Sequence, residues 1–150
     1  MEITFALIKP HAVKNIVALQ YVTEIIKNNF SVLQTKEVVV TKQLASRFYE
    51  EHQGKFFYNR LVTFMGSGPS IAFVLASKDS IAKWRTILGP TKVHKAIYSS
   101  PDSIRSLYGL SDTRNACHGS DSLESASREI SIIFPDFDYQ EELRKQMESV

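Results

Sequence analysis

The chain has 150 residues with a formal net charge of +2, and 43% of its residues are hydrophobic and 23% charged. This balance is typical of one globular domain, and it excludes whole-chain disorder, a collagen-like repeat and a strongly basic nucleic-acid-binding protein. No apolar run reaches the ~18 residues that a membrane span needs. The single cysteine, Cys117, excludes an internal disulfide framework. The acidic start without a basic leader predicts a cytoplasmic protein and leaves mitochondrial import open.

Hydrophobic patterning predicts alternating strands and helices over the first part of the chain. Ile3 to Ile8 is a short apolar run, typical of a buried strand. Apolar residues at helical spacing predict a helix over residues 15–29, and the valine-rich stretch 31–40 predicts a second strand. Thr41 is a suitable cap for a helix that reaches about His52. Three further elements follow: a helix at 56–65, a strand at 71–76 and a helix capped by Asp79 that runs through Trp84 to Leu88.

The regular periodicity fails between Gly89 and about Asn115, which predicts a long basic loop at about 89–114. Such a loop in a small domain is more often functional than accidental. Residues 115–118 predict a last strand. Asp121 and Glu124 then form an acidic variant of the capping box for a helix that has Leu123, Ala126, Ile130 and Ile133 on one face.

The order of these elements predicts an α+β fold, a mostly antiparallel sheet with helices packed on one face. Residues 1–137 form the predicted domain, and residues 138–150 an acidic C-terminal tail.

His118 is the most informative candidate for chemistry, because it stands at a predicted strand end just before a capped helix. A neutral imidazole that faces a phosphate can attack it through its free ring nitrogen, and Gly119 permits close backbone approach by a ligand. The other ring nitrogen needs an orienting partner. Glu129 can supply one only if its helix folds back past the strand. The alternative is that His118 is an ordinary polar residue at a strand end.

Phosphate chemistry also requires positive charge. Arg85, Thr91, Lys92 and Arg105 lie in or beside the long loop, and arginine forks match phosphate oxygens. Lys9 follows an apolar strand, where burying a lysine without a partner is costly. The alternatives are that the loop cations are merely solvated and that the Lys9 ammonium extends into water.

The remaining candidate residues are an aromatic side chain, the other histidines and the cysteine. Phe56 can offer its ring to a nucleobase or can belong to the core. The remaining histidines are His11, His52 and His94. None of them is spaced from other ligands as metal sites require, so no metal site is predicted. Cys117 would face the side of a strand opposite to His118, which disfavours a Cys–His pair. The sequence has no phosphate-binding P-loop and no Gly-x-Gly-x-x-Gly motif, which excludes those kinase mechanisms.

Several short motifs stand out when they are read together along residues 3–137. They are Thr4–Pro10, Phe56-Phe57 with Leu61-Val62, Ser67-Gly68-Pro69, Trp84-Arg85 through Leu88-Gly89-Pro90-Thr91, Ser103-Ile104-Arg105, Asn115–Ser122, Glu124–Ala126 and Glu129-Ile130. In this combination they resemble the nucleoside diphosphate kinase family. The Gly54–Tyr58 variant and the extended loop are similar to a divergent branch of it. The resemblance implies a ferredoxin-like, four-stranded antiparallel sheet with helices packed on it.

The resemblance also implies a ping-pong reaction in which a histidine carries the terminal phosphate of a nucleoside triphosphate to a nucleoside diphosphate. By matched position, His118 would be the catalytic nucleophile and Glu129 would orient its ring. The nucleotide-binding residues would be Lys9, Phe56, Arg85, Thr91, Arg105 and Asn115. Mg²⁺ would be held mainly through the nucleotide's own phosphates. The expected partners are therefore nucleoside di- and triphosphates, with no nucleic acid and no membrane, and a homo-oligomer is left open.

Two positions depart from the family pattern. Asp112 stands where an apolar residue usually covers one face of the base, and the family's tyrosine near the histidine has two candidates, Tyr49 and His52. The leading hypothesis is a nucleoside diphosphate kinase. The alternative is a nucleotide-binding regulatory protein with weak turnover that acts through partners. A nucleic-acid-binding module is disfavoured by the near-neutral charge and the lack of an RNA-binding aromatic motif.

Overall fold

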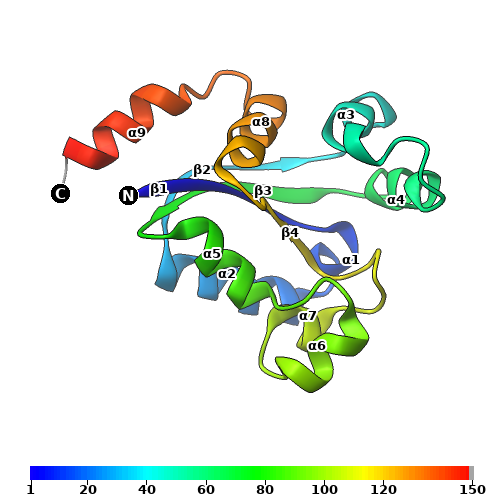
Figure 1. The fold of residues 1–150 in the computed structure, drawn as a ribbon. Coiled ribbons are helices and arrows are strands. Elements are labelled where there is room, and N and C mark those ends of the chain that lie inside the picture. The colour runs from blue at the N-terminus through cyan, green and yellow to red at the C-terminus, as the bar shows by residue number, and fades with distance from the viewer. Residues whose placement is uncertain (149–150) are drawn as a thin grey trace.

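The computed structural model describes residues 1–148, which form an α+β fold around one sheet (Figure 1). Within this range the sheet has four strands in the order β2-β3-β1-β4, and all neighbouring strands are antiparallel. The predicted fold class is thereby confirmed. The elements in chain order are β1 (Glu2–Ile8), α1 (Pro10–Val13), α2 (Ile16–Asn29), β2 (Ser31–Val38), α3 (Lys42–Phe48), the 3₁₀ turn η1 (Glu50–His52), α4 (Tyr58–Met65), β3 (Ser70–Ser77), α5 (Ser80–Leu88), α6 (Val93–Ser99), α7 (Ile104–Tyr108), β4 (Cys117–Gly119), α8 (Leu123–Ile133) and α9 (Tyr139–Glu148).

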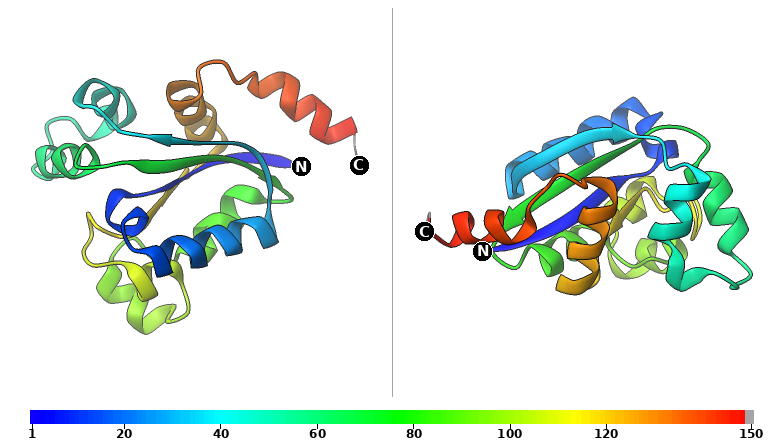
Figure 2. Two further views of the ribbon diagram at one scale, coloured as in Figure 1. Left: turned by 180° about the vertical axis from the view of Figure 1, so that it is seen from behind. Right: turned by 90° about the horizontal axis from the view of Figure 1, so that it is seen from above.

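Helices cover both faces of the sheet, so the prediction of a single covered face is wrong (Figures 1 and 2). Side chains alternate along β1, and each set enters a different core. Phe5 and Leu7 pack with residues of α3, α4 and α8, whereas Ala6 and Ile8 pack with residues of α2, α5 and α7. β1 is a central strand buried on both sides, which is why it reads as a continuous apolar run.

Several predicted elements are confirmed with shifted ends. The strand predicted at 31–40 ends at Val38. The helix predicted at 41–52 ends at Phe48 and continues as the separate turn η1. Its predicted cap is correct, because Thr41 Oγ1 accepts a hydrogen bond from the Leu44 amide at 3.2 Å. The helix predicted at 56–65 begins only at Tyr58, and the last strand is Cys117–Gly119.

The stretch predicted as an irregular loop at 89–114 contains two helices, α6 and α7. They are seven and five residues long, too short for apolar periodicity to show. α1 was also not expected, because Pro10 suggested only the end of a strand; proline is tolerated in the first helical turn. The acidic tail forms α9, whose Tyr139 and Leu143 pack against the core. Residues 149–150 of that tail lie outside the described range.

Two predicted caps are wrong. Asp79 precedes α5 with a φ of 53° and makes no side-chain capping bond. The N-cap of α8 is Ser122, whose Oγ accepts from the Ser125 amide at 3.1 Å, while Asp121 accepts from the Ser125 hydroxyl at 2.7 Å. Leu123 is the first residue of α8 and is 57% exposed, whereas Ala126, Ile130 and Ile133 are buried. Among the described residues, no helix combines the length and apolar character needed to cross a membrane.

The short strand β4 is fixed between β1 and α5. His118 lies opposite Leu7 of β1, and the Trp84 indole donates a hydrogen bond to the His118 carbonyl at 3.1 Å. A Cβ on Gly119 would lie 2.6 Å from Cδ1 of Trp84, a side chain that is fully buried. Glycine at this position therefore lets β4 lie directly on Trp84.

We expect Gly119→Ala to lower the free energy of unfolding by about 1–3 kcal/mol, because the added methyl group overpacks the core against Trp84. Urea denaturation followed by tryptophan fluorescence measures the change. Gly68→Ala is the matched control, since its methyl would meet only flexible side-chain atoms of Lys14 and the Pro10 ring, and it should stay within about 0.5 kcal/mol of wild type. Equal stability of the two variants would contradict this packing.

Candidate active site

His118 lies at the centre of β4, with its ring between two aromatic side chains. The ring centroids of Phe5 and Phe48 are 6.0 and 5.2 Å from the imidazole centroid. Its neighbour Cys117 points into the opposite core and is fully buried, as the strand alternation predicts. The His118 side chain keeps 23% of its surface exposed. The backbone is thus fixed while the ring remains accessible.

Glu129 approaches this ring because α8 folds back across β1. Its Oε1 lies 2.7 Å from Nε2 of His118 and accepts a second hydrogen bond from the Ser120 hydroxyl at 2.7 Å. Burial by itself raises the pKa of Glu129, but His118, Ser120 and Arg128 together hold that pKa below its usual value. The carboxylate is therefore ionised and accepts the Nε2 proton, which leaves the lone pair of the neutral ring on Nδ1.

Arg128, next to Glu129 on α8, ties this helix to α3. Its Nη1 donates to the carbonyl of Arg47 at 3.2 Å and, more weakly, to that of Phe48 at 3.5 Å. Its Nη2 lies 4.0 Å from Oε2 of Glu129. Neither Arg128 nor Ser120 was predicted as a site residue. Ser120 follows the histidine by two positions, a spacing that places both side chains on one side of extended backbone; no comparable signal pointed to Arg128.

Two buried cations lie near this pair. The Lys9 side chain donates to the Thr113 carbonyl at 3.2 Å, and the Arg105 guanidinium donates to the carbonyls of Gly89 and Cys117 at 2.8 and 3.0 Å. Burial, and then Arg105, lower the pKa of Lys9 to about 7. Burial also lowers the pKa of Arg105, to about 10. Neither cation forms an ion pair with a carboxylate within residues 1–148. An anionic ligand would supply the missing charge.

Asn115 connects these cations to the loop before α6. Its amide nitrogen donates to the carbonyls of Asp112 at 3.0 Å and Thr91 at 3.5 Å, and its buried Oδ1 has no hydrogen-bond partner. Arg85 and Thr91 are exposed. Burial, and to a lesser extent the charge of Arg85, lower the pKa of Arg105. The Asn115 amide thus ties the segment before β4 to the main chain at Thr91 and Asp112.

Phe56 is the predicted residue that the fold leaves apart. It lies in the connection before α4, is 93% exposed, and makes its ring contact with Phe57 at 5.6 Å. The sequence predicts a helix that already includes Phe56, but the helix begins two residues later, at Tyr58. In this conformation its ring faces solvent.

Both candidates for the family's tyrosine lie beside the histidine. Tyr49 is buried, and its hydroxyl has no hydrogen-bond partner; burial, and then Glu129, raise its pKa. The His52 ring stacks on Tyr49 at 6.2 Å. Burial, and then Lys55, lower the pKa of His52, with His118 contributing in the same direction. Neither side chain has a hydrogen bond to His118.

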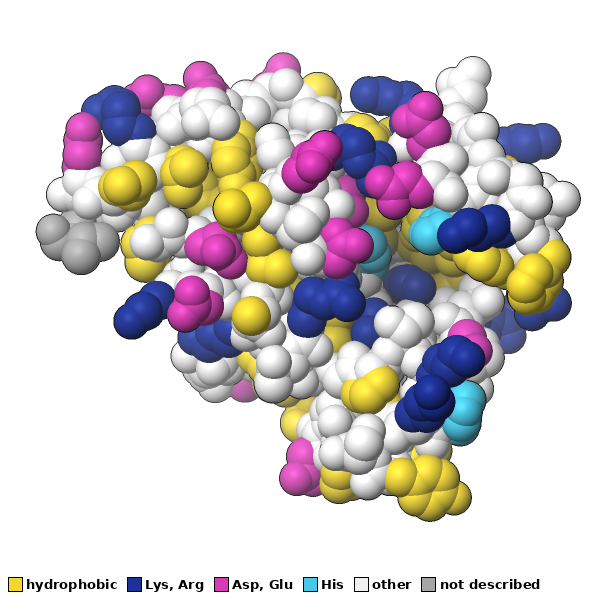
Figure 3. All heavy atoms as spheres, viewed as in Figure 1, with side chains coloured by type: hydrophobic (Ala, Val, Ile, Leu, Met, Phe, Trp, Pro, Cys, Tyr) yellow, Lys and Arg dark blue, Asp and Glu magenta, His cyan; other side chains and the backbone are white. Residues whose placement is uncertain are grey.

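The surface is hollowed at this place. Figure 3 shows a depression between the α3–α4 side of the molecule and the α6–α7 side, with histidine and basic side chains at its edge and floor. Among the described residues, no group of three or more His, Cys, Asp or Glu side chains is placed to hold a metal ion. The site thus combines an oriented imidazole with unpaired cations, an arrangement suited to accepting an anionic group at Nδ1.

Comparison with known proteins agrees with this geometry. The family model described as nucleoside diphosphate kinase matches residues 2–139. A human relative described as nucleoside diphosphate kinase 6 is 52% identical over 141 residues, which cover 93% of this chain and 76% of the relative. A zebrafish protein of the same description is 47% identical over 146 residues, covering 97% and 83%.

Solved structures show the same fold. A nucleoside diphosphate kinase from Aquifex aeolicus superposes with a TM-score of 0.83 at 38% identity, over 89% of this chain and 94% of that one. The enzyme from Encephalitozoon cuniculi gives 0.82 at 29% identity, over 91% and 90%. The family and the fold support nucleotide phosphotransfer as the chemistry of the site. The chain belongs to the nucleoside diphosphate kinase family.

Proposed function

We propose that this protein transfers the terminal phosphate of a nucleoside triphosphate to a nucleoside diphosphate through a phosphorylated His118. The observation that carries the proposal is the 2.7 Å contact between Nε2 of His118 and Glu129. It fixes the ring and its tautomer and leaves Nδ1 as the nucleophile.

The first half-reaction follows from these positions. Nδ1 of His118 attacks the terminal phosphorus, the bond from that phosphorus to the bridging oxygen breaks, and a nucleoside diphosphate leaves with the negative charge. The imidazole becomes cationic as it attacks, and the ionised Glu129 stabilises that charge. Lys9 and Arg105 offset the charge of the phosphate oxygens. A second nucleoside diphosphate then takes the phosphoryl group by the reverse of these steps, so one site serves both substrates.

Mg²⁺, which the family generally uses with nucleotides, would reach the site bound to the substrate phosphates. The described side chains around His118 are mostly donors and cations, which suit phosphate oxygens and not a carboxylate cage. A bound ion would neutralise part of the charge of the phosphate oxygens. Assembly into a homo-oligomer, which is common in the family, and a cytoplasmic location stay predictions for this chain.

We expect incubation with γ-labelled ATP to give a protein label that is stable in base and labile in acid, and His118→Ala to abolish it. Steady-state transfer from ATP to a second nucleoside diphosphate should fall below detection in the same variant. Thermal unfolding of both proteins checks that the variant is folded. Label that persists in His118→Ala would place the nucleophile elsewhere. Nucleotide binding by wild type without repeated turnover would favour a regulatory protein.

Glu129→Gln should reduce kcat on the order of 10²-fold while KM changes by no more than about threefold, because the amide cannot stabilise the imidazolium that forms during attack. Initial rates with saturating nucleotides measure both constants. Glu124→Gln is the matched control, since Glu124 lies exposed on the same helix, and its rates should equal those of wild type. Unchanged kcat in Glu129→Gln would remove this carboxylate from the mechanism.

The lowered pKa of Lys9 predicts that the free energy of unfolding depends on pH. Its pKa is about 7 in the folded chain against an ordinary 10.5, so above pH 7 the unfolded chain binds more protons and the free energy of unfolding rises with pH. Above about pH 9 the buried Cys117, whose pKa is raised to about 12, opposes this trend. We expect a rise on the order of 1 kcal/mol between pH 7 and 9 that Lys9→Met removes.

Urea denaturation at several pH values between 7 and 9 measures the slope. Lys42→Met, at an exposed lysine, should keep the wild-type slope. Lys9→Met should also weaken binding of a nucleoside diphosphate by at least about tenfold, because one charge-assisted hydrogen bond is lost. A wild-type slope in Lys9→Met would show that the folded chain holds this lysine charged throughout the range.

A further inference from the structure

Residues 41–67, which contain α3, η1 and α4, form one wall of the depression at the candidate active site (Figure 3). The wall lies at one end of the sheet, with α3 in contact with α8 (Figure 1). Within residues 1–148, every hydrogen bond between this wall and the rest of the chain is donated by the Arg128 side chain of α8. Packing in the core that the wall shares with β1 and α8 supplies apolar contacts. One guanidinium is therefore the hydrogen-bonded link between the wall and the fold.

Arg128 occupies acceptors that the end of α3 leaves open. The last carbonyls of a helix have no partner inside that helix. The Ser46 carbonyl accepts a hydrogen bond from Gln53, within the wall, at 3.1 Å. The carbonyls of Arg47 and Phe48 accept from Arg128 at 3.2 and 3.5 Å. A planar guanidinium can reach both carbonyls because it presents several donors in a fixed fork.

Phe48, the last residue of α3, packs against the proposed nucleophile. Its side chain is buried, and its ring centroid lies 5.2 Å from that of the His118 imidazole, edge to face. Glu129 holds the same imidazole through Nε2, and Nη2 of Arg128 lies 4.0 Å from the other oxygen of that carboxylate, Oε2. Arg128 thus contacts both the main chain that carries the Phe48 ring and the carboxylate that orients the imidazole.

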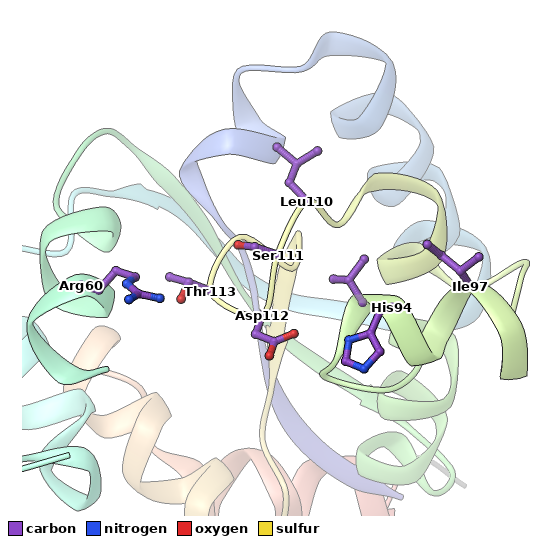
Figure 4. Close-up of a pocket in the computed structure, with 8 residues that line it drawn as sticks. Arg60, His94, Ile97, Leu110, Ser111, Asp112 and Thr113 are labelled. Atoms are coloured by element: carbon purple, nitrogen blue, oxygen red, sulfur yellow. The ribbon is translucent and has the colours of Figure 1, made fainter. Parts of the chain in front are cut away.

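The α4 end of the wall has no comparable tie. Arg60 and Thr113 line a cavity of about 530 Å³, and Arg60 projects from α4 toward Thr113 (Figure 4). Among the residues that the structure describes, the Arg60 guanidinium takes part in no hydrogen bond or ion pair. If the bonds from Arg128 are removed, no other hydrogen bond in residues 1–148 joins the wall to the fold.

We propose that Arg128 is a positioning residue for phosphoryl transfer at His118; this inference rests on the proposed function. It holds the Phe48 main chain and the Glu129 carboxylate in place, and these two residues contact the imidazole directly. Arg128 itself has no hydrogen bond to His118. A misplaced nucleophile slows the chemical step, whereas the buried cations on β1 and α7 still bind the phosphates. The loss of Arg128 therefore lowers kcat and not the affinity for nucleotide.

Steady-state transfer from ATP to a second nucleoside diphosphate tests this inference on the whole chain. Arg128→Met keeps most of the aliphatic stem and removes the charge and the donors. We expect it to lower kcat by about tenfold and to leave both KM values within about threefold of wild type, because misplacement by 1 Å can cost about 10²-fold in rate. The rate at which γ-labelled ATP labels His118, measured by rapid quench, should fall by the same factor as kcat.

Arg128→Lys is a milder second variant, which carries the test if Arg128→Met does not fold. One ammonium cannot bind two carbonyls as a planar fork does, so we expect kcat to fall by about threefold at wild-type KM. All rates are measured well below the melting temperature of each variant. A merely structural role would lower that temperature and leave the kcat of the folded variant unchanged.

Arg47→Met is the matched control, because it removes an exposed arginine side chain from the same wall and keeps the carbonyl that Arg128 binds. Its kcat and KM values should equal those of wild type. Wild-type kcat in both Arg128 variants, or a loss confined to KM or to the melting temperature, would overturn the positioning role while leaving phosphotransfer intact. If wild type itself shows no turnover, both the proposed function and this inference are overturned.

Discussion

The hydrogen bond between His118 and Glu129 is the interaction on which the rest of the site depends. It joins a three-residue edge strand to a helix that begins only after that strand has ended. The strand is held by β1 and by the Trp84 indole, and the helix by the core that it shares with Phe5. Packing fixes both elements in the folded chain. The imidazole and the carboxylate are therefore already in position, and no further conformational entropy is lost in bringing them together.

The charge balance of the site is unusual for a folded interior. Lys9 and Arg105 are 6% and 8% exposed, and their hydrogen bonds go to main-chain carbonyls. Carbonyl dipoles orient the two cations without neutralising them, so the positive potential remains available to a ligand. Folding therefore carries an electrostatic cost that a bound anion would offset, a trade between stability and function.

The sequence alone predicts the parts of this fold that depend on local pattern. β1 and β3 are continuous apolar runs, and α2 and α5 show helical spacing long enough to be recognised. Pattern reasoning does not find α6 and α7, which are too short for a period to develop. It also places helices on one face of the sheet only, since a run such as Ile3–Ile8 does not show which side chains meet which helix.

For the site, the identity of the residues is more accessible from sequence than their arrangement. His118 and Glu129 carry a strong signal in their motif, but whether α8 returns to the strand depends on tertiary packing. Arg128 is invisible to motif reasoning because its partners are main-chain carbonyls, which leave no trace in residue identity. Phe56 shows what residue identity leaves open: the sequence allows either a core position or a stacking platform, and the structure places the ring in solvent, ahead of α4.

The anchoring of α3 by Arg128 has a consequence for substitutions at the end of α3. The two acceptors, at positions 47 and 48, belong to the peptide backbone, and every amino acid supplies the same carbonyl. The tether itself therefore does not depend on which side chains stand at positions 47 and 48, whereas the Phe48 ring is held by its own contacts with Phe5 and His118. One arginine on a neighbouring helix thus holds the end of α3 in place through groups that a side-chain substitution does not remove.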